Sequence, residues 1–198
     1  NFEGKGEFCP APYFYQNKGE AEYVVACYQY MRLLGYPAEK ISIITTYNGQ
    51  KNMIRDVMAQ RCLNPMFGKP AKITTVDKYQ GQQNDYILLS LVRTDSVGHL
   101  RDIRRLIVAM SRARLGLYVF GRANLFINCF ELAPILSQLM VTNENKLELV
   151  TGESYNIGTV RKSRDEELSE DAKLHVVDDL SAMGVLVYQM IQATQAQK

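Results

Sequence analysis

The sequence predicts a doubly wound α/β fold, a three-layer sandwich around a mainly parallel sheet, over about residues 1–140. Two observations carry this prediction. Short apolar runs alternate with helical patterns at the pitch of βα units. A length of 198 residues with a 46% hydrophobic share also suffices to bury one full core. After Met140 the composition changes, which predicts a small C-terminal strand and helix appendage over 141–198.

The first third of the chain predicts a loop, a helix, a strand and a second helix. Residues 8–14 are aromatic and broken by proline, which is typical of an edge strand or an entering loop. From Glu20 onward apolar residues recur at helical spacing, which predicts a helix that Asn17 can cap. Ile41–Thr45 is a β-branched run typical of a strand buried on both faces, and Gly49–Arg61 predicts the second helix.

The middle of the chain continues this alternation. Ile73–Val76 and Tyr86–Val92 predict strands, and the polar stretch Asp77–Asp85 joins them. A helix is expected at Asp102–Arg112, and Leu115–Gly121 predicts the last strand of the sheet. We expect that helix to face the core through Ile103, Leu106, Ile107 and Met110.

The last third predicts shorter elements. Two short helices are expected within 124–139. Leu147–Val150 and Leu174–Val177 predict short strands, and Ser181–Gln192 predicts a closing amphipathic helix. Residues 151–172 are rich in charged and small polar residues, so we expect a mobile linker there.

The composition disfavours several classes of protein. Lys and Arg number 23 against 21 Asp and Glu, and a net charge of +2 does not suit a basic nucleic-acid arm or an acidic tail. The four cysteines are scattered, which disfavours a zinc site or a disulfide scaffold. No apolar stretch approaches the ~20 residues of a membrane span, so we expect an intracellular protein with no membrane partner. The chain opens at Asn1, without an initiating Met, from which we expect a piece of a longer protein.

Two motifs of nucleotide hydrolases do not occur in this sequence. There is no G-x-x-x-x-G-K-S/T phosphate loop, and no Asp-Glu pair follows an apolar strand where it would hold magnesium. His99 and His175 are isolated, which disfavours a catalytic histidine. The chain is therefore expected to lack a phosphate cradle and a metal site of its own.

Three constellations carry chemistry, and the first is the polar stretch Asp77–Asp85. The carboxyl ends of parallel strands are where α/β folds bind ligands, and Gly81 permits close approach of a phosphate or nucleotide to the backbone. The alternative interpretation is a solvated, glutamine-rich loop.

The second constellation is a cluster of arginines. Six of them fall within 22 residues, against the single acid Asp102. They are Arg101, Arg104, Arg105, Arg112, Arg114 and Arg122. The guanidinium fork suits phosphate oxygens, and an arginine delivered from one domain to a nucleotide on another acts as an arginine finger. The alternative is a solvated basic helix face.

The third constellation is the strand-to-helix junction at Ser42–Gln50. Free amide groups at a helix start attract phosphate, and Tyr47 can stack on a base. The alternative is that the threonines and the asparagine there are ordinary helix caps.

Taken together, the three segments resemble a known family. Residues 44–50 (ITTYNGQ), 74–94 and 104–122 resemble motifs IV, V and VI of superfamily 1 RNA/DNA helicases of the nonsense-decay group, and QNKGEAEYV resembles the N-x-x-EA segment before motif IV. The resemblance covers about residues 10–125 and implies a second RecA-like helicase domain. Further segments, including the tail to 198, resemble the spliceosomal, intron-binding branch of that group.

The resemblance implies roles for individual residues. Arg112 falls on the arginine finger and is the implied catalytic residue. The implied nucleotide-binding residues are Gln80, Gly81, Gln83, Arg105, Arg114 and Lys18. The implied RNA-binding residues are Thr46, Tyr47, Gln50, Thr75, Val76 and Asp77. Gln83 stands where the group usually carries a Glu that touches the ribose, and Lys18 stands where some members carry an Arg near the γ-phosphate.

The function implied is that of an ATP-dependent RNA helicase in pre-mRNA splicing, acting in the nucleus. ATP and Mg²⁺ would lie between this domain and a first RecA-like domain of the same chain, which would carry the phosphate loop and the magnesium ligands. Single-stranded intron RNA and spliceosomal proteins are the implied partners, and this domain alone would be inactive. The alternative is a non-catalytic, helicase-like scaffold that docks proteins in a ribonucleoprotein. An independent RNA-binding module would need a continuous basic surface, which a net charge of +2 does not promise.

Overall fold

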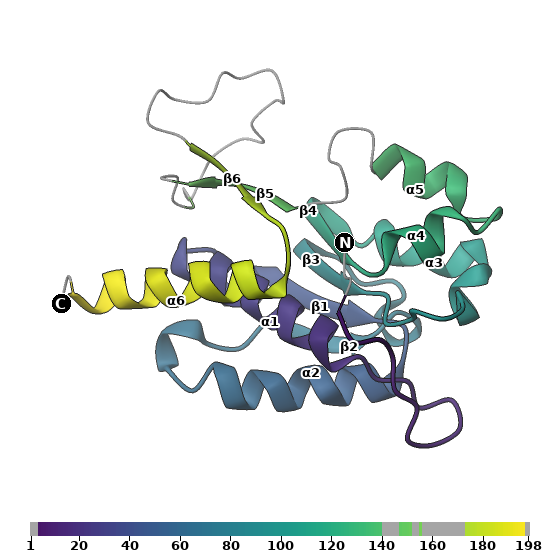
Figure 1. Ribbon diagram of the computed structural model, residues 1–198, viewed down its shortest axis with the longest axis horizontal. Helices are drawn as coiled ribbons and strands as arrows, with labels where there is room; N and C mark the ends of the chain where they lie inside the picture. The colour runs from purple at the N-terminus through teal and green to yellow at the C-terminus, as the bar shows by residue number, and fades with distance from the viewer. Residues whose placement is uncertain (1–3, 140–146, 152–154, 156–172, 197–198) are drawn as a thin grey trace.

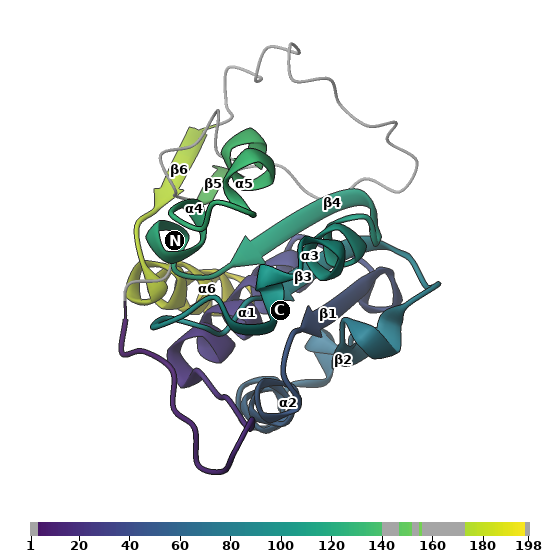
Figure 2. The same ribbon diagram turned by 90° about the vertical axis from the view of Figure 1, so that its right-hand side faces the viewer.

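A parallel sheet lies at the centre of the computed structural model, which describes residues 4–139, 147–151, 155 and 173–196 (Figure 1). The four strands lie in the order β2-β1-β3-β4 (Figure 2). They are β1 (Ile41–Thr45), β2 (Lys72–Thr75), β3 (Asn84–Ser90) and β4 (Ala113–Phe120). All three pairings are parallel, so the predicted α/β class with a parallel sheet is confirmed, and the architecture is consistent with a RecA-like fold.

Helices cover both faces of the sheet, as the alternation of elements predicts. One face carries α1 (Lys18–Leu33), α2 (Asn48–Arg61) and α6 (Leu180–Ala196). The other carries α3 (Ile103–Met110), α4 (Ala123–Ile127) and α5 (Ala133–Leu139). Short 3₁₀ turns lie at Ala38–Lys40, Pro65–Phe67, Asp77–Tyr79 and Gly98–Arg101.

The strands bury both of their faces because successive side chains point to opposite sides. Ile43 and Leu88 pack toward α1 and α2, whereas Ile44 and Leu89 pack toward α3 and α4. The all-buried run Ile41–Thr45 is therefore a central strand.

The helix limits follow local chemistry in most places. The side chain of Asn17 accepts a hydrogen bond from the backbone N–H of Glu20, so the predicted cap of α1 is confirmed. The predicted inner face of α3 is wrong at Ile107, which is 49% exposed. Leu106 and Ala109 are the buried residues of α3, and Ile107 lies off the stripe that they define.

The carboxyl-terminal elements pack against α1. Strands β5 (Leu147–Thr151) and β6 (Lys173–Val177) form a separate antiparallel pair, and both were expected as strands. Val177 and Met183 belong to the same apolar cluster as α1, and α6 lies alongside α1 in Figure 1. The predicted boundary near residue 140 and nearly all of the predicted linker 151–172 lie outside the described residues.

Within the described part of the chain, no helix is both long and apolar enough to cross a membrane.

Candidate functional site

The polar stretch Asp77–Asp85 crosses the sheet and does not stay at one edge. Because β1 lies between β2 and β3, the chain must run from the carboxyl end of β2 over β1 to the amino end of β3. Tyr79 holds this crossing segment down: its side chain is buried, and its hydroxyl donates to Ser42 Oγ at 3.0 Å. The start of the segment, at Asp77, lies at the carboxyl end of β2 as expected, whereas the rest is carried toward the amino edge.

The crossing segment lies beside the arginines of α3 and β4. Arg105 approaches Asp77 at 3.9 Å, and the Nη1 of Arg112 donates to the carbonyl oxygen of Gln82 at 3.4 Å. Arg114 pairs with Asp85 at 2.9 Å. The structure thus brings the first two predicted constellations together, motif V against motif VI.

Arg112 differs from its two neighbours because its contacts are all neutral. Its Nε donates to the carbonyl oxygen of Val108 at 2.8 Å, and its Nη2 donates to Ser111 Oγ at 2.8 Å. No ion pair neutralises it within the described residues. The half-buried guanidinium is positioned by oxygens that leave its positive charge available to a ligand.

The predicted nucleotide-binding residues of motif V lie on the surface. Gln80, Gly81 and Gln83 are all exposed. Gly81 has a φ of +75°, and a Cβ placed there would meet nothing within 4 Å, so its backbone is open to a ligand. Exposed amides, an open glycine and an unneutralised arginine fit a phosphate-bearing group.

A magnesium ion finds no comparable set of ligands. No group of three or more His, Cys, Asp or Glu residues gathers within the described part of the chain. Asp85, the best-placed carboxylate, already pairs with Arg114 and with Lys40 at 3.4 Å. The residues described here are suited to bind the phosphate groups of a nucleotide, but not a magnesium ion bound to those phosphates.

Lys18 lies apart from these arginines. It begins α1 and is exposed. Its neighbour Asn17 donates through Nδ2 to the carbonyl oxygen of Val92, just beyond the carboxyl end of β3. Lys18 is therefore at the carboxyl edge of the sheet, whereas Arg112 precedes the amino end of β4.

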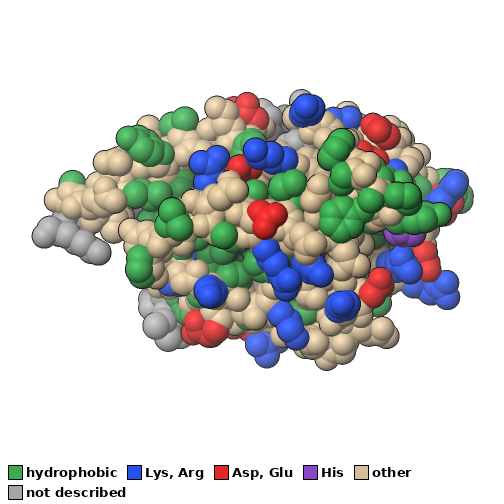
Figure 3. Space-filling model, turned by 90° about the horizontal axis from the view of Figure 1, so that it is seen from below, with side chains coloured by type: hydrophobic (Ala, Val, Ile, Leu, Met, Phe, Trp, Pro, Cys, Tyr) green, Lys and Arg blue, Asp and Glu red, His purple; other side chains and the backbone are tan. Residues whose placement is uncertain are grey.

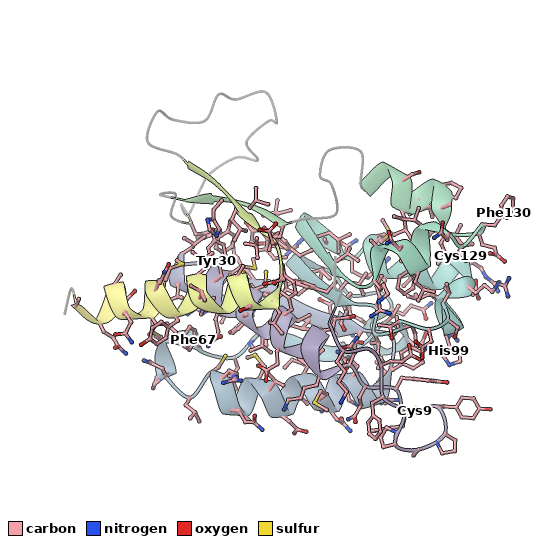
Figure 4. The ribbon with its side chains drawn as sticks, in the orientation of Figure 1. Cys9, Tyr30, Phe67, His99, Cys129 and Phe130 are labelled. Carbon is pink, nitrogen blue, oxygen red and sulfur yellow. The ribbon has the colours of Figure 1, made fainter. Side chains whose placement is uncertain are left out.

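Two predicted RNA contacts at the carboxyl edge are buried. Gln50 has no exposed surface: its Oε1 accepts from the N–H of Asn17 at 2.7 Å, and its Nε2 donates to the Asn17 carbonyl oxygen and to Ser90 Oγ. Tyr47 is 4% exposed, and its hydroxyl accepts from Arg93 Nη1 and from the N–H of His99, a residue labelled in Figure 4. As placed, the Tyr47 ring is not available to a base.

The other predicted RNA contacts divide between buried and accessible. Thr75 and Val76 are buried, and the N–H of Val76 continues the ladder by donating to Thr45. Thr46 is half-buried with its hydroxyl donating to the Leu91 carbonyl oxygen, and Asp77 is exposed. Only the last two present side chains at this edge.

The residues that hold the carboxyl edge together were not singled out from the sequence. Arg93 pairs with Glu7 at 2.8 Å, with both side chains under 10% exposed, and lies 4.0 Å over the ring of Tyr15. Burial alone would raise the pKa of Glu7, but the N–H groups of Thr94 and Asp95 and the Arg93 guanidinium hold it below its ordinary value. The signal available was an arginine directly after an apolar strand.

Glu20 is the second residue that the sequence interpretation missed. Its carboxyl group has no exposed surface, and Oε1 accepts from Ser90 Oγ at 2.6 Å and from the N–H of Val92 at 2.8 Å. Oε2 has no partner within the described residues. Burial raises the pKa of Glu20 to about 7, and the two hydrogen bonds only partly offset that effect.

Val92 is held in an unusual conformation by these partners. Its φ is +73°, a left-handed value that a β-branched residue rarely adopts. Glu20 accepts from its N–H and Asn17 donates to its carbonyl oxygen, so both of its backbone polar groups are fixed. This turn directs Arg93 back toward Glu7 and Tyr47.

Comparisons with known proteins find similar sequences, among them three proteins with different names. The chain is 58% identical over 191 residues, 96% of its length, to "RNA helicase aquarius" of Mus musculus. It is 35% identical over 156 residues, 78% of its length, to "Pre-mRNA-splicing factor cwf11" of Schizosaccharomyces pombe. It is also 38% identical over 128 residues, 63% of its length, to "Regulator of nonsense transcripts 1" of Dictyostelium discoideum, of which it covers 9%.

These relatives are much longer than this chain, which spans 12% of the length of each of the first two. The motif-based resemblance to nonsense-decay helicases is nevertheless confirmed over the expected residues. The family model described as "AAA domain" (AAA_12) matches residues 4–124. That range contains the whole parallel sheet and all three motif segments, and the chain accordingly belongs to the AAA domain family.

Proposed function

We propose that this chain is the second RecA-like domain, residues 1–140, with its C-terminal appendage, of an ATP-dependent RNA helicase that acts in pre-mRNA splicing in the nucleus. The names of two relatives, an RNA helicase and a pre-mRNA-splicing factor, support the helicase activity and the process. The observation that carries the proposal is the neutral setting of Arg112 beside the exposed motif V segment. A charge held in place without a counter-ion suits a ligand that brings the negative charge.

In this proposal the amino edge binds ATP together with a first RecA-like domain of the same protein. The bound triphosphate supplies the phosphoryl group whose transfer to water drives the motor. Arg112 stabilises the charge that develops on that group, and the open backbone at Gly81 with the Gln80 and Gln83 amides orients the nucleotide. Arg105 and Arg114 orient the crossing segment through Asp77 and Asp85. Magnesium ligands belong to the first domain, so this chain alone is inactive.

The carboxyl edge binds single-stranded RNA, the intron of a pre-mRNA, through its backbone. Thr46, Asp77 and the nearby amide groups are the accessible contacts, and Tyr47, Gln50, Thr75 and Val76 shape the edge from below. Contacts to phosphate and sugar suit a motor that must hold every sequence about equally. Spliceosomal proteins are the further partners.

A non-catalytic scaffold is the second candidate, and Gln83 favours it. The amide stands where the resemblance expects a carboxylate at the ribose, which weakens one nucleotide contact. The setting of Arg112, Gln80 and Gly81 argues against a scaffold that binds no nucleotide. Protein docking does not require an arginine without a counter-ion near a glycine with an open backbone.

The deciding experiment measures ATP hydrolysis by the full-length protein with Arg112→Ala. A finger acts mainly in the transition state, so kcat should fall by about 10³–10⁵ while KM for ATP changes little. Arg104→Ala is the matched control, because Arg104 is exposed and, among the residues that the structure describes, its side chain pairs with Asp102 alone. Unchanged turnover in the Arg112 variant would favour the scaffold.

A further inference from the structure

A groove of about 610 Å³ lies beside the edge strand β2, next to the amino end of that strand. It runs between the second half of α2, the loop that follows α2, and the edge strand β2. Its walls are largely apolar, with Met58, Pro65, Pro70 and Ile73 among them. Leu63 stands at the groove with 80% of its surface exposed. Apolar area of this kind favours a bound partner, because burying it removes it from water.

The groove carries positive side chains. Arg55, Lys69 and Lys72 line it, and none of its lining residues is acidic. Arg55 donates to the carbonyl oxygen of Ile73 at 3.1 Å, and Lys72 donates to the side-chain amide oxygen of Gln82. Lys69 is exposed and makes no hydrogen bond or ion pair within the described part of the chain. None of the three cations is in an ion pair within the described part of the chain.

A further lysine lies close to the groove on α2, although the exposed Asp56 follows Arg55 on the same helix. The pKa of Lys51, one turn before Arg55 on α2, lies below its ordinary value because of partial burial and then the charges of Arg55 and Lys78. Figure 3 views the molecule from below α2 and shows Lys and Arg side chains gathered beside hydrophobic ones on this face. A ligand that brings carboxylates would be attracted to this face.

The lining distinguishes a peptide from a nucleic acid. Single-stranded nucleic acids bind where aromatic side chains stack on their bases, and the groove has no aromatic lining residue. It offers instead aliphatic side chains, proline rings and the edge of a sheet, the setting in which extended peptides bind. We propose that this groove binds an acidic peptide segment carrying a bulky aliphatic side chain, which covers the exposed Leu63 and Pro65 while its carboxylates contact Lys69 and its neighbours.

The test uses the 198-residue chain and fluorescein-labelled peptides of about ten residues, roughly 33 Å when extended. One peptide alternates Glu with Leu, a second replaces every Glu by Gln, and a third replaces every Leu by Ser. Fluorescence anisotropy up to about 1 mM chain should show the Glu-Leu peptide binding about tenfold more tightly than either counterpart.

Two variants locate the binding. Lys69→Glu and Leu63→Asp should each weaken the Glu-Leu peptide by about tenfold or more, since both residues are exposed and neither change disturbs the core. Lys5→Glu and Val185→Asp are the matched controls, on exposed residues outside the groove, and should bind as the parent does.

Three results would overturn the proposal. One is no binding of the Glu-Leu peptide at about 1 mM, and another is equal affinity for the Gln-Leu peptide. The third is displacement of the peptide by an oligouridine whose own affinity falls in Lys69→Glu, which would reassign the groove to RNA. The proposal does not depend on ATP hydrolysis, so its failure leaves the proposed function intact.

Discussion

The carboxyl and amino edges of the parallel sheet carry similar side chains in opposite settings. At the carboxyl edge, Arg93 and Glu7 are nearly inaccessible, and Glu20 is completely buried beside them. At the amino edge, Arg114 pairs with Asp85 while remaining 57% exposed, and Arg112 meets only neutral oxygens. The difference shows that arginine density alone does not mark a ligand site. An arginine that is buried against a paired carboxylate stabilises the fold, whereas an exposed arginine without a paired carboxylate can bind a ligand.

The largest expected effect is at Arg93. Arg93→Ala leaves the buried Glu7 without its ion-pair partner and the Tyr47 hydroxyl with one donor in place of two, so the free energy of unfolding should fall by about 3 kcal/mol. Urea denaturation measures this. Arg104→Ala removes an ion pair whose arginine is 85% exposed, and it should leave the urea midpoint unchanged. An equal loss of unfolding free energy in the two variants would contradict the proposed difference between buried and exposed arginines.

A pH titration sharpens the contrast at Glu20. The folded protein holds the Glu20 proton up to a pKa of about 7, against an ordinary value of 4.5, so the folded state binds more protons between these limits. Stability should therefore fall as pH rises through this window, by about 1 kcal/mol per pH unit, and become level above it. Glu20→Gln cannot ionise and should remove that slope.

Urea denaturation at several pH values, comparing Glu20→Gln with the parent, isolates this contribution. Glu22→Gln serves as the control, because Glu22 is not fully buried and pairs with Arg61, whose side chain is 59% exposed. A slope that survives in Glu20→Gln would mean that another group is responsible.

The conformation of Val92 predicts that glycine is a more stable replacement than alanine at this position, the reverse of the usual order. Gly is normally less favourable than Ala in a strand or helix, but at a φ of +73° only Gly avoids steric strain. Val92→Gly should therefore be more stable than Val92→Ala by about 1 kcal/mol. At Val119, within β4, the same two substitutions should show the ordinary order, and thermal melts of all four variants decide.

The smallest expected effect on stability is at Arg112. Arg112→Ala removes hydrogen bonds to carbonyl and hydroxyl oxygens at the surface, so the free energy of unfolding should change by no more than about 0.5 kcal/mol. Together with a large loss of kcat in the full-length protein, this would separate a functional arginine from the structural Arg93. A loss of stability close to that of Arg93→Ala would instead make Arg112 part of the scaffold.

Much of the fold was predictable because the local patterns are unambiguous. Ile41–Thr45 is apolar or β-branched at nearly every position and is a central strand, and Asn17 followed by an amphipathic run begins α1 as expected. The prediction that Ile107 faces the core was wrong because helical periodicity identifies only the apolar face of α3. The neighbouring elements decide which part of that face is buried.

The candidate site was predictable in its residues and less so in its geometry. The arginines and the glutamine-rich segment were visible in the sequence, but their proximity depends on β1 inserting between β2 and β3. The burial of Tyr47 and Gln50 depends on Tyr15 and Asn17, which lie more than thirty positions earlier. No local pattern reveals such a contact.

The crossing segment between β2 and β3 also connects the two proposed sites. Residues 76–83, eight in number, must pass along the five residues of β1, a distance of about 17 Å. Fully extended they would reach at most about 29 Å, and the 3₁₀ turn at Asp77–Tyr79 shortens them further. The buried Tyr79, whose hydroxyl donates to Ser42 of β1, fixes the middle of this span on the sheet. One short segment thus connects the proposed RNA edge, at Asp77, to the amino edge, at Gln82 and Arg112, so the two proposed sites share a single stretch of backbone.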